Sequence, residues 1–91
     1  MAIAVYFGSQ SMDAQKYSEV LKQLESAGAG SPKGRVYHAT FGDSNDLHVF
    51  DVWSSQAEFD AFGVILMPIL AKNGVNPSKP EIMPIHNIIK Q

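Results

Sequence analysis

The sequence of 91 residues contains no cysteine. This absence excludes disulfide bonds, thiolate metal sites and cysteine nucleophiles together, and it is consistent with a reducing compartment. Long apolar runs are also absent, because no stretch approaches the ~18 apolar residues that a spanning helix needs. The first ten residues, MAIAVYFGSQ, lack the basic segment of a signal peptide. We therefore expect a cytoplasmic protein with no membrane association.

Charge of either sign is scarce. Charged residues make up 18% of the chain, against a typical ~25%, and the net charge is −2. The seven basic residues are scattered, so nothing favours binding to nucleic acid or to an anionic membrane. The length allows one domain, residues 1–91. Because 45% of the residues are hydrophobic and few are charged, we expect apolar surface that meets a second subunit.

The hydrophobic pattern predicts six elements in the order β-α-β-β-α-β. Apolar runs rich in β-forming residues predict strands, and apolar positions at helical spacing predict helices. Ser11 is the expected N-cap of the first helix, and Ser55 with Glu58 forms a capping box for the second. This order predicts an α+β, ferredoxin-like fold in which two helices cover one face of a four-stranded antiparallel sheet. The expected strands are 2–8, 35–41, 46–53 and 81–89. The expected helices are 12–27 and a second helix that begins after Ser54 or Ser55 and ends at residues 73–74.

The predicted strands 35–41 and 46–53 form a hairpin, which we expect to close through a four-residue loop, 42–45. Phe41 then lies opposite Asp46, and residues can be sorted by face. The Trp53 face is expected to lie under the helices, because the second helix begins directly after that strand. The opposite face would be bare in a monomer, so we predict a homodimer whose sheets meet face to face. The Trp53 face includes His38 and Asp51, and the bare face includes Arg35, Tyr37, Phe41, His48 and Phe50.

The segment VFDVWSSQAEFDAF, residues 49–62, resembles the dimeric α/β-barrel superfamily, in its antibiotic-biosynthesis-monooxygenase-like branch. The C-terminal MPIHNII, residues 83–89, is similar to small uncharacterised members. The resemblance implies a dimeric barrel. It also implies a range of activities that includes oxygenases without a cofactor, haem-degrading enzymes and proteins of no known activity. The haem-degrading members use a Trp at the position of Trp53 and a helical His as iron ligand, but the expected second helix, within residues 54–74, contains no His. We therefore expect no cofactor.

His38 and Asp51 are the candidate catalytic pair, because a carboxylate beside an imidazole fixes the tautomer of a general base. The predicted function is a monooxygenase-like enzyme that acts on a small aromatic or hydrophobic compound. The alternative is a non-catalytic ligand-binding or interaction module in which the same residues only pack. Histidine spacing typical of a metal site is absent, so no metal is expected. The candidate ligand-binding residues are Trp53, as a pocket wall, with His86, Phe59 and Phe62.

Overall fold

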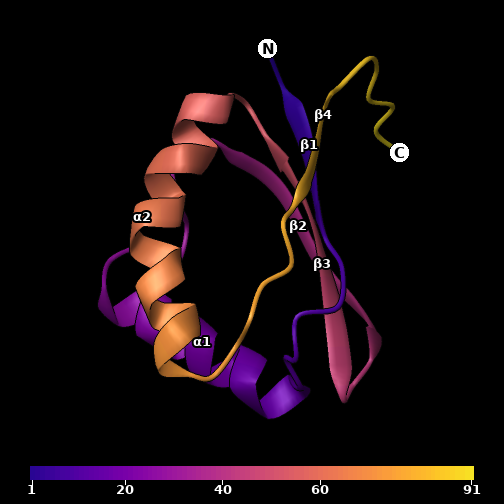
Figure 1. Cartoon of the computed structure of the whole chain (residues 1–91). Helices are drawn as coiled ribbons and strands as arrows, with labels where there is room; N and C mark the ends of the chain where they lie inside the picture. Colours follow the sequence, from indigo (N-terminus) through magenta and orange to yellow (C-terminus); the bar gives the residue numbers. More distant parts are fainter.

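The computed structural model describes all 91 residues, and it confirms the predicted α+β, ferredoxin-like fold. The sheet has the strand order β2-β3-β1-β4, and all three neighbouring pairs are antiparallel. Both helices cover the same face of this sheet (Figure 1). The elements in chain order are β1 (Ile3–Phe7), α1 (Ala14–Ser26), β2 (Arg35–Asp43), β3 (Asp46–Trp53), α2 (Gln56–Lys72) and β4 (Glu81–Pro84).

The hydrophobic core lies between the sheet and the two helices. Alternate residues of β1 are buried, as expected for a strand with one covered face, and Val5 is completely buried at its centre. The apolar side chains of α2 face this core, and Leu66 and Ile69 pack against the edge of the core. The helices contribute Val20, Leu24, Phe59, Phe62 and Leu70 to the buried set. No helix combines the length and apolar character needed to cross a membrane.

The two helix starts differ from each other in how well the sequence predicted them. The predicted N-cap of α2 at Ser55 is confirmed, because the backbone amide of Glu58 donates to the Ser55 hydroxyl at 3.2 Å. The cap of α1 is Asp13 and not Ser11, since the Lys16 amide donates to the Asp13 carboxylate at 2.8 Å. Ser11 instead has a positive φ of 56°. This turn places Met12 in the core, where it is 2% exposed.

The hairpin closes two residues tighter than the sequence indicated. Asp43 pairs with Asp46, so only Ser44 and Asn45 form the loop. Asp43 favours this turn because its carboxylate accepts a hydrogen bond from the Asn45 amide at 2.8 Å. A shift of two residues preserves which face each side chain occupies, because side chains alternate with a period of two. The predicted sorting of His38 and Asp51 onto one face therefore holds.

A β-bulge near the start of β2 corrects one assignment. Arg35 pairs with Trp53, whereas Tyr37 already pairs with Val52, so one extra residue is accommodated between them. The extra residue, Val36, is 51% exposed. As a result Arg35 lies on the helix side of the sheet, and not on the open face where the regular alternation had placed it.

The last strand is shorter than predicted and ends at Pro84. Proline has no amide hydrogen to donate, so pairing with β1 stops there. One further contact follows, from the Ile85 amide to the Ala2 carbonyl at 2.9 Å. Residues 86–91 are exposed and extend beyond the sheet as coil (Figure 1). β4 is the outer strand beside β1, and an edge position tolerates a proline that has no amide hydrogen to donate.

Candidate functional site: a Tyr17–His38–Asp51 relay beside an apolar cavity

His38 on β2 and Asp51 on β3 are direct partners across the hairpin. The tighter hairpin brings them opposite each other, and His38 Nδ1 lies 2.6 Å from Asp51 Oδ1. The Asp51 side chain is 4% exposed and that of His38 is 21% exposed. The predicted pair is therefore in hydrogen-bond contact under the helices, with one edge of the imidazole still accessible.

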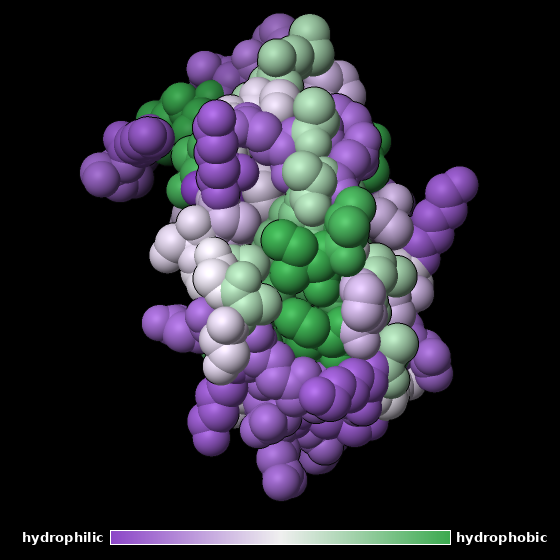
Figure 2. All heavy atoms as spheres, turned by 90° about the vertical axis from the view of Figure 1, so that its left-hand side faces the viewer, coloured by the Kyte–Doolittle hydropathy of each residue, from purple (hydrophilic) through white to green (hydrophobic).

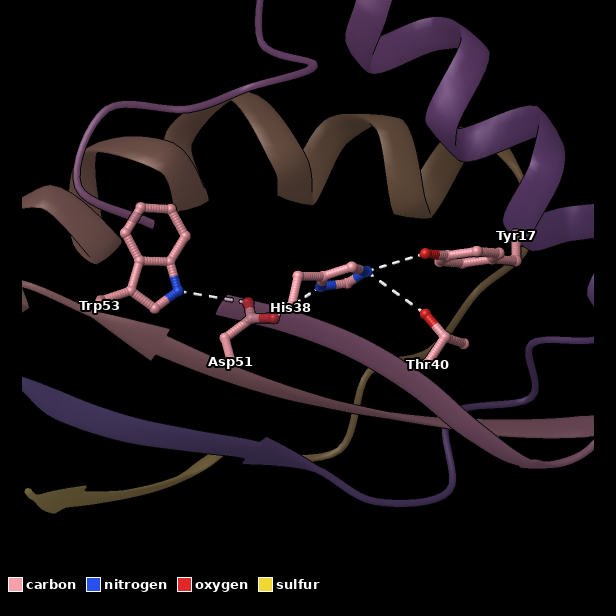
Figure 3. A network of polar contacts seen from close by, with 5 residues as sticks. All are labelled: Tyr17, His38, Thr40, Asp51 and Trp53. Carbon is pink, nitrogen blue, oxygen red and sulfur yellow. Dashed lines mark hydrogen bonds and ion pairs between the residues drawn. The ribbon is translucent and has the colours of Figure 1, made fainter. Parts of the chain in front are cut away.

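Trp53 holds the second carboxylate oxygen of Asp51. The indole Nε1 donates to Asp51 Oδ2 at 3.2 Å (Figure 3). Trp53 is completely buried, and its ring centroid lies 5.6 Å from that of Phe59 and 5.2 Å from that of Phe62. Because the indole is fixed by this packing, it fixes the carboxylate, and the carboxylate fixes the imidazole in turn.

Tyr17 completes the relay from the helix side. Its hydroxyl lies 2.8 Å from His38 Nε2, and the Thr40 hydroxyl lies 3.3 Å from the same nitrogen (Figure 3). An ionised carboxylate only accepts hydrogen bonds, so His38 Nδ1 is the donor to Asp51, and in the imidazole tautomer with its one proton on Nδ1 the Nε2 atom is an acceptor. The hydroxyl of Tyr17 is then the donor. Sequence reasoning missed Tyr17, because its helical position predicted only core packing and its partner is 21 residues away.

A cavity of about 50 Å³ adjoins this relay between the sheet and the helices. Ten of its 14 lining residues are hydrophobic, and the remaining four are Gln10, Arg35, His38 and Asp51. Leu21 also lines it and is 39% exposed, so this side chain separates the cavity from solvent. The site therefore combines a chain of hydrogen bonds through Tyr17, His38 and Asp51 with a small, mostly apolar cavity.

Not all of the other predicted site residues line the cavity. Phe62 lines it, whereas Phe59 and Trp53 pack behind the relay and do not. His86 lies in the exposed coil after β4 and does not line the cavity either. No group of three or more His, Asp or Glu side chains is placed to hold a metal ion.

Glu58, at the first turn of α2, has a pKa below its ordinary value of 4.5. The hydroxyl of Ser54 has the largest effect, followed by that of Ser55, because both donate to the ionised carboxylate. The nearby positive charge of Lys33 acts in the same direction. This carboxylate serves the helix start and does not line the cavity.

The helix layer also carries exposed apolar side chains on its outer surface, opposite the core. They gather in the middle of the face shown in Figure 2. The large apolar side chains that α1 and α2 leave exposed are Leu21, Val64, Ile65 and Met67.

Solved structures with the same fold include proteins described as oxygenases. An antibiotic biosynthesis monooxygenase, provisionally assigned, from Chloroflexus aurantiacus J-10-fl matches with a TM-score of 0.67 and 12% identity, over 99% of this chain and 98% of the other. SnoaB, a cofactor-independent oxygenase from Streptomyces nogalater, matches with a TM-score of 0.65 and 13% identity, over 99% and 97%. A protein of unknown function from Nitrosomonas europaea, NE2512, gives 0.57 and 16%, over 99% and 90%.

Comparison of the sequence with family models and with curated proteins gives no match. At 11–16% identity the structural likeness shows the fold and carries no activity with it. The chain therefore has the ferredoxin-like fold of the antibiotic-biosynthesis-monooxygenase-like proteins, as the segment at residues 49–62 predicted.

Proposed function

We propose that this protein is a small monooxygenase-like enzyme that acts on a small aromatic or hydrophobic compound without a cofactor. The observation that carries the proposal is the Tyr17–His38–Asp51 relay, whose three side chains line an apolar cavity. A buried carboxylate that holds an imidazole in one tautomer is the arrangement of a general base. SnoaB shows that a cofactor-independent oxygenase exists on this fold.

In the proposed reaction the relay removes a proton from a phenolic substrate. The substrate hydroxyl donates to the Tyr17 oxygen while the Tyr17 proton moves to His38 Nε2, and Asp51 stabilises the resulting imidazolium. The electron-rich phenolate transfers one electron to oxygen, and the two radicals then combine through a new carbon–oxygen bond. Loss of water from the peroxide gives a quinone. One phenol with a free para hydrogen and one O₂ thus yield one quinone and one water.

The cavity must expand to admit such a substrate. Its volume is about 50 Å³, whereas an engineered cavity of about 150 Å³ is known to admit benzene. Leu21 and Leu66 line it and are not fully buried, so their side chains can move outward without disturbing the sheet. Substrate entry therefore proceeds between α1 and α2, where these residues lie.

The small cavity also favours a second candidate, a non-catalytic module. In that case the space is a packing defect, and Trp53, Phe59 and Phe62 simply fill the core behind it. We do not propose haem in either case, because α2 has no histidine to serve as the iron ligand that the resemblance implies.

Oxygen consumption with 1-naphthol and with anthrone tests the enzyme. We expect His38→Ala to lower turnover by about 10²–10⁴-fold, since that is the usual contribution of a general base. Tyr17→Phe should lower it comparably, because the relay then ends before it reaches the substrate. His86→Ala is the control, because His86 is exposed and outside the cavity. Full turnover in both relay variants would remove the base assignment, and no turnover by the wild type would favour the module.

We also propose that the chain is a homodimer that buries the sheet face opposite the helices. This open face carries large apolar and aromatic side chains with nothing over them. Tyr37 is 56% exposed, Phe41 is 44% exposed and Met83 is 61% exposed. Phe41 stacks on Tyr6 at 6.3 Å, and the Tyr6 hydroxyl lies 2.7 Å from His48 Nδ1, so the face is already ordered. Soluble monomers rarely leave so large an apolar surface in water.

Sedimentation measures this association directly. A charge buried between two apolar sheets is strongly unfavourable, so Phe41→Asp should shift the dimer towards monomer. Val64→Asp is the matched control, because Val64 is 76% exposed on the outer surface of α2. A wild type that sediments as a monomer at micromolar concentration would contradict the proposed dimer.

A further inference from the structure

A groove with a volume of about 300 Å³ opens beside α2. The helix forms one wall, and the coil that follows α2 runs back past the helix to β4 and supplies the other wall with residues 77–80 (Figure 1). At its base lie two rings of the hydrophobic core, those of Phe7 and Phe59, whose centroids are 6.1 Å apart. The groove is therefore apolar at its base. The polar side chains that line it are all exposed, and they are Asp60, Ser78 and Lys79.

Phe7 and Leu66 form the wall between this groove and the cavity, because both side chains line both spaces. Phe7 is buried and is held in the sheet by β1. Leu66 is only half-buried and packs at the edge of the core, so it is the member of the wall that can move. The outward movement of Leu66 that admits a substrate ring to the cavity therefore also joins the cavity to the groove.

The helix α2 is weakened on both sides of Leu66. Pro68 has no amide hydrogen, so the Val64 carbonyl lacks its helical partner. Gly63 lies one turn before Leu66, and glycine is the least favourable residue other than proline inside a helix. Gly63 lines the groove, where a Cβ would meet no atom within 4 Å. The chain thus leaves the groove open at Gly63 although a larger residue would fit and would stabilise the helix, and such a glycine suits a ligand that approaches the backbone.

We propose that the groove binds the apolar extension of a phenol whose ring occupies the cavity. The hydroxyl of this phenol lies on the Tyr17–His38 relay, and the extension passes Leu66 and lies against α2 at Gly63. The groove reaches the lower end of the range of about 300–1,000 Å³ that is usual for small-molecule sites, whereas the cavity alone does not. The extension is not para to the hydroxyl, because the proposed reaction removes the para hydrogen. The inference rests on the proposed function and names its substrate class, but its test requires binding and not oxygen chemistry.

Methionine methyl groups report which space a ligand enters. Met12 lines the cavity, Met67 lines the groove, and Met83 is exposed on the open face of the sheet. The probes are 3-methylphenol and 3-butylphenol, which differ only in the length of the extension, and the measurement is a ¹H–¹³C spectrum of protein labelled at its methionine methyl groups. We expect both phenols to shift the Met12 signal, only 3-butylphenol to shift the Met67 signal, and neither to shift that of Met83.

Calorimetric titration with the same two phenols measures the contribution of the groove. Each buried methylene group is worth about fourfold in affinity, so the wild type should bind 3-butylphenol at least about tenfold more tightly than 3-methylphenol. Gly63→Leu fills the groove and should remove most of this preference by weakening 3-butylphenol alone, and Gly63→Ala should remove part of it. Ala57→Leu is the matched control, because it places the same side chain at an exposed position of α2 outside the cavity and the groove.

A Met67 signal that 3-butylphenol leaves unchanged would overturn the proposed role of the groove. So would equal affinity of the wild type for the two phenols, a complete lack of binding at millimolar concentration, or an unchanged preference in a folded Gly63→Leu variant. Thermal denaturation reports whether each variant folds. If Gly63→Leu does not fold, Gly63→Ala carries the test, and a preference equal to that of the wild type would overturn the proposal. Binding of 3-butylphenol at Met67 without oxygen consumption would sustain the groove and refute the oxygenase, so the two failures are distinguishable.

Discussion

Replacing Asp51 by Asn changes the direction of the relay while keeping nearly the same shape. Trp53 Nε1 only donates, so the Asn oxygen must accept from it, and the Asn amide group then faces His38 Nδ1. Two donors cannot pair, so Nδ1 must become the acceptor and the imidazole proton must move to Nε2. His38 then donates to the Tyr17 oxygen and can no longer accept a proton there. The variant should fold but lose base catalysis.

The magnitude follows from the two hydrogen bonds to Asp51. Hydrogen bonds to a charged group are worth about 1.5–3 kcal/mol and neutral ones about 0.5–1.5 kcal/mol. Exchanging two of the first kind for two of the second lowers the free energy of unfolding by about 2 kcal/mol. For a domain of this size that is a fall in Tm of about 8–16 °C. Asp51→Ala leaves both Trp53 and His38 without a partner, so it should lose about 3–5 kcal/mol.

Two measurements check this prediction. Two-bond ¹H–¹⁵N correlation spectra identify the protonated nitrogen of His38, and chemical denaturation gives the change in stability. Asp46→Asn is the matched control, since the Asp46 side chain is 45% exposed and lies 3.9 Å from the His48 ring on the open face. A His38 that keeps its proton on Nδ1 in Asp51→Asn would refute the tautomer reasoning, as would equal stability of the Asn and Ala variants.

Two further predictions concern the start of α2. The pKa of Glu58 is lower in the folded state than in the unfolded chain, so its contribution is present above about pH 4.5 and is lost as the pH falls through the folded value. The stability difference between wild type and Glu58→Gln, measured by urea denaturation, should therefore shrink below that pH, and a constant difference would contradict it. Gly34 has φ +92°, and an added Cβ would lie 2.5 Å from the Glu58 carboxyl carbon. Gly34→Ala should lower stability by about 1–3 kcal/mol. The control Gly63→Ala, where the Cβ meets open space, should raise it by about 1 kcal/mol, and equal effects of the two would contradict the steric reasoning.

Much of the fold was predictable because it rests on local signals. The change of hydrophobic period between strands and helices placed all six elements, and Ser55 with Glu58 marked the start of α2. The face of each hairpin residue was also predictable, since an error of two residues in register does not alter it. The cap at Asp13 was missed because Ser11 and Asp13 are both plausible caps, and the choice depends on where Met12 is buried.

The arrangement of the candidate site was also predictable only in part. That His38, Asp51 and Trp53 share one face of a sheet follows from the sequence alone, because alternation along a strand is a local property of the backbone. The contact between Tyr17 and His38 and the position of Arg35 at the cavity follow only once the chain is folded. The contact depends on how α1 packs on the sheet. The position of Arg35 depends on a single bulge that reverses the alternation at one residue.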